Sequence, residues 1–143
     1  MSKTEQILDK LETLLEQNCE ARVERNETDP ERIPKTGLIV IHDGDPGEPA
    51  YTLGGFADTY YSHAIEIDVF VQAGRKEERD SKFDALMQQI DMVLQSYPKL
   101  DGLIDGMLYG RPDTETQSID GGAAVKTATL FIEVDYQTST PLG

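Results

Sequence analysis

Apolar residues recur at helical spacing in two segments of the chain. The first set is Ile7, Leu8, Leu11, Leu14 and Leu15, and the second is Phe83, Leu86, Met87, Ile90, Leu94 and Tyr97. Residues three and four positions apart share one face of an α-helix. The pattern predicts a helix from the N-cap Ser2 to about Asn18, with Glu5 completing a capping box, and a second helix that Pro98 ends.

Two longer segments alternate between apolar and polar residues. Within residues 60–72 one face carries Tyr61, His63, Ile65, Ile67, Val69 and Val71, and within residues 123–138 one face carries Ala128, Leu130, Ile132, Val134 and Tyr136. Successive side chains of a strand point to opposite faces, so strict alternation is typical of a half-buried strand in an antiparallel sheet. Both segments are therefore predicted to be long strands.

Shorter strands are predicted at Leu38–Ile41 and at Ala50–Leu53, with the turn-rich segment DGDPGEP between them. Residues 37–54 are thus expected to form a hairpin with an acidic tip, which the pair Gly54-Gly55 ends. Brief strands are also expected within the segment ARVERNE (residues 21–27) and at residues 107–109, whereas the rest of residues 20–36 and residues 110–121 are expected to be mainly loops. The order of elements predicts one α+β domain over residues 1–143, with an antiparallel or mixed β-sheet and two amphipathic helices packed on one face.

Composition excludes several classes of function. Lys and Arg number 13 against 27 Asp and Glu, which gives a net charge of −14, and both halves of the chain are acidic. This balance argues against a protein that grips nucleic-acid phosphates or anionic lipid. The chain has no apolar run of signal-peptide or transmembrane type, and its single cysteine allows no intrachain disulfide. We therefore expect a protein that folds in a reducing cytoplasm and does not enter a membrane.

The sequence carries no recognisable catalytic or cofactor motif. It lacks a G-x-S-x-G elbow, a Walker motif and a dinucleotide fingerprint. His63 continues the inward face of a strand and is expected to be a core histidine with its hydrogen bonds satisfied. His42, Asp43 and Asp45 are metal-ligand types, but their spacing matches no established site, so a solvated loop tip is favoured there. We predict no catalytic, cofactor-binding or metal-binding residue and no enzymatic activity.

The polar faces of the two long strands hold the more informative residues. Each carries a pair of carboxylates and an outward aromatic residue: Glu66, Asp68 and Phe70 on one strand, and Phe131, Glu133 and Asp135 on the other. If the strands are neighbours, the carboxylates form one acidic patch, although like charges directly opposite one another are destabilising. The patch is either an ordinary solvated face or a surface that meets a partner. The two aromatic residues are either interface anchors or covered by another segment.

In its order of elements the chain resembles the small tail-completion proteins of long-tailed bacteriophages and prophages, and more narrowly the tail terminator, or minor tail protein U-like, group. The segments that carry the resemblance are ILDKLETLL, GLIVIHDGDPGEPAYTLGG, HAIEIDVFVQA, FDALMQQIDMVL, DGLIDGMLYGRPDTE and ATLFIEVDYQT. They span nearly the whole chain. The likeness lies in the order of elements and in the character of these short segments, and it includes no catalytic motif.

The resemblance implies a structural role without chemistry or cofactors. Proteins of this group form a ring, usually a hexamer, on the last ring of the tail tube, where they stop polymerisation and meet the head–tail connector. The implied location is the virion tail, after assembly in the bacterial cytoplasm, and a monomer in isolation is compatible with it. DNA would pass through the lumen without specific binding. The residues implied to line or rim the pore, or to form interfaces, are Glu66, Asp68, Phe70, Phe131, Glu133 and Asp135, or Asp43, Asp45 and Glu48 at the hairpin tip.

Three other classes stay open at this point. A phage head–tail connector or joining protein shares the size, acidity and α+β content of the chain. A small metal- or ligand-binding α+β domain would use the acidic cluster for a divalent ion. A DNA-mimic inhibitor ranks third, because Lys and Arg are interspersed with the acidic residues of the helices.

Overall fold

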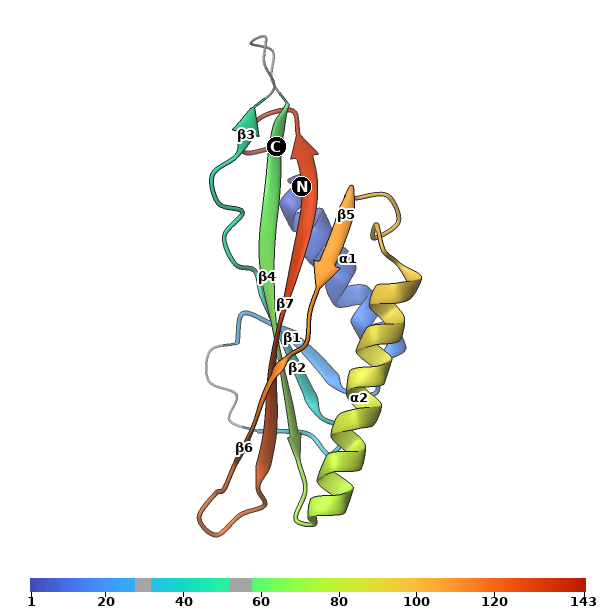
Figure 1. Ribbon diagram of the computed structural model, residues 1–143, viewed down its shortest axis with the longest axis vertical. Coiled ribbons are helices and arrows are strands. Elements are labelled where there is room, and N and C mark those ends of the chain that lie inside the picture. Colours follow the sequence, from blue (N-terminus) through green and yellow to red (C-terminus); the bar gives the residue numbers. More distant parts are fainter. Residues whose placement is uncertain (28–31, 52–57) are drawn as a thin grey trace.

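Two antiparallel strands of 14 residues each, β4 (Thr59–Gln72) and β7 (Val125–Thr138), run along the middle of the molecule (Figure 1). The structure is a computed structural model that describes residues 1–27, 32–51 and 58–143. The remaining elements are α1 (Lys3–Asn18), β1 (Arg22–Arg25), β2 (Leu38–His42), β3 (Ala50–Tyr51), α2 (Lys76–Ser96), β5 (Gly106–Tyr109) and β6 (Asp113–Gln117).

The strands form one mixed sheet in the order β1-β2-β4-β7-β5. β1 and β2 are parallel, and the other pairs are antiparallel. β3 joins β4 beyond the end of β2, and β6 joins β7 beyond the end of β5, so each long strand has two short partners along its outer edge. The two long strands are therefore central, and the short ones form the margins of the sheet.

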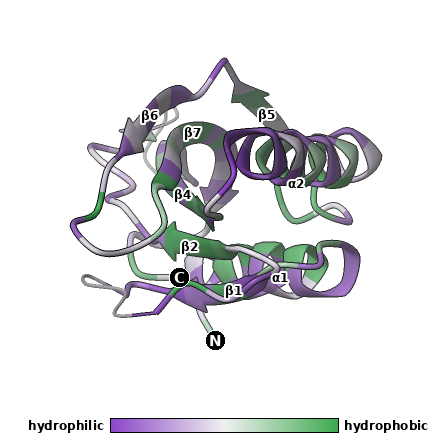
Figure 2. Ribbon diagram, turned by 90° about the horizontal axis from the view of Figure 1, so that it is seen from below, coloured by the Kyte–Doolittle hydropathy of each residue, from purple (hydrophilic) through white to green (hydrophobic). Residues whose placement is uncertain are grey.

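Both helices lie on the same face of the sheet, as Figures 1 and 2 show. α1 packs on β1 and on α2, and α2 also packs on β4 and β7. The core is formed by the apolar stripes of the two helices and by the inward residues of the central strands, including Ile65, Ile67, Ile132 and Val134. The predicted α+β class, with two helices on one face of a mixed sheet, is confirmed. Neither described helix combines the length and the apolar character needed to span a membrane.

The start of α1 agrees with the sequence in one respect and differs in another. Ser2 is the N-cap, and its Oγ accepts a hydrogen bond of 3.1 Å from the backbone N–H of Glu5. The Glu5 carboxylate, however, accepts hydrogen bonds from Arg25 on β1. The predicted capping box is wrong in this half, because a charged partner from another element binds the carboxylate that would otherwise turn back to the cap.

The predicted hairpin over residues 37–54 is wrong. β2 and β3 do not pair with each other; both pair with the same edge of β4, where His42 is opposite Glu66 and Ala50 is opposite Tyr60. The connecting residues 43–49 carry two prolines, which cannot donate to a ladder, and they interrupt the pairing instead of reversing it. A Cβ on Gly44 would collide with the carbonyl oxygen of Ala64, so glycine allows this segment to lie against β4. Gly54-Gly55 lies outside the described residues.

Strand β6 was not expected from the sequence, which predicted a loop over residues 110–121. All five β6 residues are exposed, so they show no apolar alternation. The strand forms because the edge of β7 beyond β5 offers unpaired backbone groups, which β6 pairs from Asp113 to Gln117. The brief strand expected at Met107–Tyr109 is present as β5.

Candidate functional site

The candidate site is the face of β4 and β7 that points away from the helices, which we call the outer face. Glu66, Asp68, Glu133 and Asp135 occupy alternate positions that oppose the buried ones. The strands that carry them are direct neighbours. The structure therefore brings the four predicted carboxylates onto one surface.

The register of the two strands staggers these charges. Each predicted carboxylate faces an uncharged residue: Glu66 faces Phe131, Asp68 faces Thr129, Glu133 faces Ala64 and Asp135 faces Ser62. No two of the four are directly opposite, so the strongest like-charge repulsion expected for a cross-strand pair is avoided. Ser62 Oγ also donates a 2.7 Å hydrogen bond to the Asp135 carboxylate.

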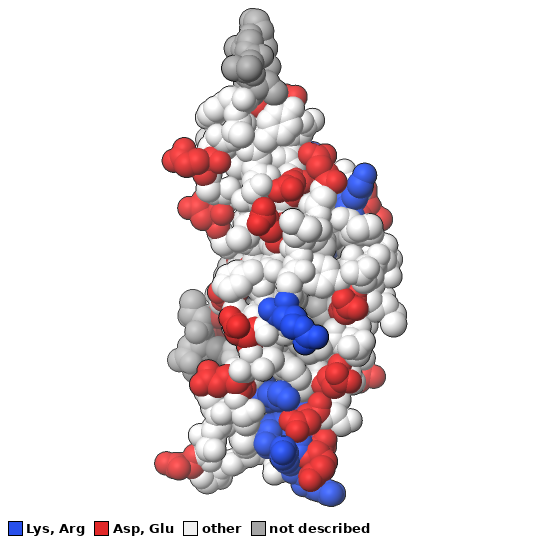
Figure 3. Space-filling model, in the orientation of Figure 1, with Lys and Arg blue, Asp and Glu red and all other residues white. Residues whose placement is uncertain are grey.

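Exposed apolar side chains lie among these carboxylates. Phe131 is 54% exposed, and Leu108 of β5, which pairs with Glu133 and so points to the same side, is 70% exposed. Phe70 is half-buried. In Figure 3, acidic side chains are spread over the visible side of the molecule, and basic side chains gather near the lower end, where α2 begins. The outer face thus combines uncovered apolar groups with negative charge.

Near the middle of β4, on the side of β2, the outer face holds a compact cluster of three ionisable side chains. His42, the last residue of β2, places Nε2 2.8 Å from Asp68 Oδ2 and 3.7 Å from Glu66 Oε2. Burial and the neighbouring Asp68 raise the pKa of Glu66. Thr129 Oγ1 donates a 3.1 Å hydrogen bond to the other oxygen of Asp68. The sequence alone groups His42 with Asp43 and Asp45, which are close to it in the chain. Only the pairing of β2 with β4 shows that its neighbours in space are Glu66 and Asp68.

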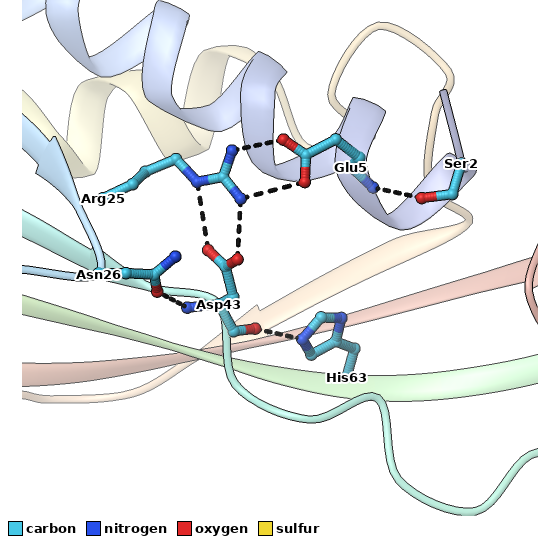
Figure 4. A network of polar contacts seen from close by, with 6 residues as sticks. All are labelled: Ser2, Glu5, Arg25, Asn26, Asp43 and His63. Atoms are coloured by element: carbon cyan, nitrogen blue, oxygen red, sulfur yellow. Dashed lines mark hydrogen bonds and ion pairs between the residues drawn. The ribbon is translucent and has the colours of Figure 1, made fainter.

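Hydrogen bonds and ion pairs hold the first residue of the acidic segment after β2, Asp43, in place (Figure 4). Arg25 donates to both oxygens of Asp43, at 3.2 and 2.9 Å, and to both oxygens of Glu5, at 2.7 and 3.2 Å. The backbone N–H of Asp43 donates to the Asn26 side chain. Asp43 is therefore part of a partly buried network of hydrogen bonds and ion pairs that joins α1, β1 and the end of β2. Asp45 and Glu48 remain exposed.

His63 is a core histidine with both ring nitrogens satisfied, as predicted. It is 1% exposed; Nε2 donates to the carbonyl oxygen of Asp43 at 2.5 Å, and Nδ1 accepts from the Tyr136 hydroxyl at 3.1 Å. Burial lowers the pKa of His63, since the charged imidazolium would lose its hydration. The neutral imidazole of His63 therefore holds the segment after β2 against β4.

This arrangement predicts that acid weakens the fold through His63. The unfolded state binds a proton near pH 6.5, whereas the folded state resists protonation, so the stabilisation is complete above about pH 6.5 and is lost as the pH falls toward the folded-state pKa. Each pH unit within that window costs at most about 1.4 kcal/mol. Urea unfolding of the wild type and of His63→Gln at about pH 7.5 and 5.5 measures the effect. The variant should lose less stability on acidification, and an equal loss would contradict the assignment. His42→Gln is the matched control.

A second surface lies between α2 and the chain that leaves β5. It is a groove of about 630 Å³, whose lining includes Phe83, Met87, Leu94, Pro112 and Leu130. The sequence placed the helical residues in the core but did not predict the groove, because residues 110–112 show no pattern from which their path could be predicted. The groove is mainly apolar and differs in shape and composition from the outer face.

Comparison with known proteins adds only weak likeness of fold. No protein-family profile matches the sequence, and no curated protein matches it. Among solved structures, the fold is similar to a chain of a structure titled "Virion of native gene transfer agent (GTA) particle", with 10% sequence identity and a TM-score of 0.33 over 92% of this chain and 91% of that one. Likeness at this level carries no inference about function.

Proposed function

We propose that this protein is a structural subunit of a phage or prophage particle, which forms a ring on the end of the tail tube, ends its polymerisation and joins the tail to the head. The element order that underlies the resemblance to tail terminators agrees with the fold in its two helices and two long strands. The observation that carries the proposal is the outer face, where Phe131 and Leu108 are exposed among carboxylates. Uncovered apolar groups on the exposed face of a sheet favour a protein partner.

A closed ring requires two different surfaces on each subunit, because every contact joins one patch to another. The outer face and the groove beside α2 are two such surfaces. The outer face offers protruding apolar side chains, and the groove offers an apolar hollow lined by Met87 and Pro112. In the proposed ring, these surfaces mediate the contacts between neighbouring subunits and with the tail-tube protein.

The charge of the chain suits a lumen through which DNA moves. A net charge of −14 on each subunit gives a ring a strongly negative field, which repels phosphates and prevents DNA from adhering. Asp45 and Glu48 are exposed and free to line or rim such an opening. The proposed role involves no catalytic chemistry and requires no cofactor.

The proposal is tested by mixing the purified protein with the tail-tube protein of the same phage or prophage and measuring tube length by electron microscopy. We expect tubes of limited length that carry an additional density at one end. The double variant Phe131→Asp/Leu108→Asp should weaken this capping by at least about tenfold, because it places charge in a buried contact. Met92→Asp, which changes an equally exposed apolar residue on α2, is the matched control and should still cap.

The outcomes separate the proposal from the alternatives. Unlimited tube growth in the presence of the wild-type protein would refute the capping role. Binding to the portal-side connector without any effect on tube length would instead favour a head–tail joining protein. Equal loss of capping in Met92→Asp and the double variant would show that the outer face has no particular part in the contact.

A further inference from the structure

Three metal-binding side chains converge on the outer face from two neighbouring strands. His42 on β2 pairs directly with Glu66 on β4, and Asp68 follows two residues later, so all three side chains point to the same side. One ligand atom from each residue lies within 4.8 Å of the other two. The juxtaposition of an imidazole and two carboxylates is set by strand register, which places the three Cβ atoms on a rigid part of the sheet.

The distances approach those of a tetrahedral metal site. Ligand atoms about 2.0–2.2 Å from a zinc ion stand roughly 3.3–3.6 Å apart in tetrahedral geometry. His42 Nε2 lies 2.8 Å from the Asp68 oxygen and 3.7 Å from the Glu66 oxygen, so small rotations of the side chains suffice. The three side chains are between 21% and 36% exposed, which leaves the fourth position open to solvent.

A neighbouring residue orients one of these ligands. Thr129 Oγ1 holds Asp68 Oδ1, and this hydrogen bond turns Oδ2 toward His42. Hydrogen bonds to the non-coordinating oxygen of a carboxylate are the usual means by which a protein orients its metal ligands. The cluster therefore has three candidate ligands, and Thr129 orients one of them, Asp68.

We propose that His42, Glu66 and Asp68 bind a divalent transition-metal ion of the zinc type, with water in the fourth position. The imidazole nitrogen favours zinc over magnesium and calcium, which prefer oxygen ligands only. The metal takes Nε2 of the neutral imidazole, whose proton then resides on Nδ1. The ion neutralises two carboxylates that otherwise repel each other, and it links β2 to β4. This site is independent of the proposed ring, since the isolated chain contains all its ligands.

The chain offers a direct readout, because it has only two histidines. Zinc chloride is titrated into the full-length protein in a non-chelating buffer, and the imidazole signals are followed by NMR while calorimetry gives the affinity. We expect one zinc ion per chain and a shift of the His42 signals, with the buried His63 signals unchanged. Magnesium chloride should produce neither effect.

Variants assign the ligands. His42→Ala and Asp68→Asn should each weaken zinc binding by at least about tenfold, and Thr129→Val by about tenfold through loss of its orienting hydrogen bond. Asp135→Asn removes a carboxylate from the same face but outside the cluster, and should retain the wild-type affinity within about twofold. Unchanged His42 signals at millimolar zinc in the wild-type protein would overturn the proposal, as would wild-type affinity in His42→Ala. The wild-type spectrum decides the question even if a variant fails to fold.

Discussion

Replacing Ile132 with alanine is expected to lower the free energy of unfolding by about 3–4 kcal/mol, the largest effect we predict for a single substitution. Ile132 lies in the middle of β7, fully buried, between Ile65 of β4 and Tyr109 of β5. Truncation removes three carbon atoms from the centre of the core. The helices on one side and the paired strands on the other cannot all move to fill the cavity, so its cost adds to the lost burial of apolar surface.

The adjacent residue provides a matched control. Phe131→Ala removes a larger side chain from the same strand, but Phe131 points to the outer face and is 54% exposed. Its loss should cost less than about 1 kcal/mol. Urea denaturation of both variants, with unchanged m-values, gives the comparison. A larger effect for Phe131 than for Ile132 would contradict the register, because a shift of one residue exchanges the two faces of a strand.

Replacing Arg25 with alanine is expected to destabilise the protein by about 2 kcal/mol. The guanidinium donates to the carboxylates of both Glu5 and Asp43, and its side chain is only 17% exposed. Its loss leaves two acidic groups close together without their cation. Both carboxylates keep some contact with water, at 44% and 32% exposure, so the cost stays below that of breaking a fully buried ion pair.

A second arginine on the same strand is the control for this prediction. Arg22 also contacts a glutamate, Glu24, but its side chain is 68% exposed. Arg22→Ala should change the free energy of unfolding by less than about 0.5 kcal/mol, as is typical of surface ion pairs. In addition, the hydrogen bond from Arg25 lowers the pKa of Glu5, and this shift should disappear in Arg25→Ala but persist in Arg22→Ala. Similar stability losses in the two variants would refute the special role of Arg25.

The stability predictions and the functional proposals concern different sides of the sheet. Ile132 and Arg25 contribute to the packed side and to its connection with α1, whereas Phe131 and the His42 cluster lie on the outer face. Because Phe131 pairs directly with Glu66, the metal cluster borders the apolar surface proposed to meet neighbouring subunits. Substitutions on the outer face can therefore alter assembly or metal binding while the fold is retained.

Local pattern predicted the elements that bury one continuous stripe of apolar side chains. α1, α2, β4 and β7 are each 14 residues or longer, and each repeats apolar residues at the period of its own backbone. Burial of those stripes makes the main favourable contribution to the free energy of folding, so the period of the apolar residues matches the conformation that each segment adopts. The outward positions of Glu66, Asp68, Phe70, Phe131, Glu133 and Asp135 follow from the same alternation.

The sequence by itself determined the two helices, the two long strands, the α+β class and the acidic outer face. Only the tertiary structure decided which segments pair at the margins of the sheet and which polar groups meet. β6 forms on unpaired backbone groups of β7, and its own residues carry no apolar pattern that would predict a strand; for β3, a strand was predicted but its pairing with β4 was not. The partners of Glu5, Asp43 and His42 depend on strand register, which brings together residues 18 to 26 positions apart in the sequence. Hydrogen bonds and ion pairs between such distant residues leave no periodic trace in the chain.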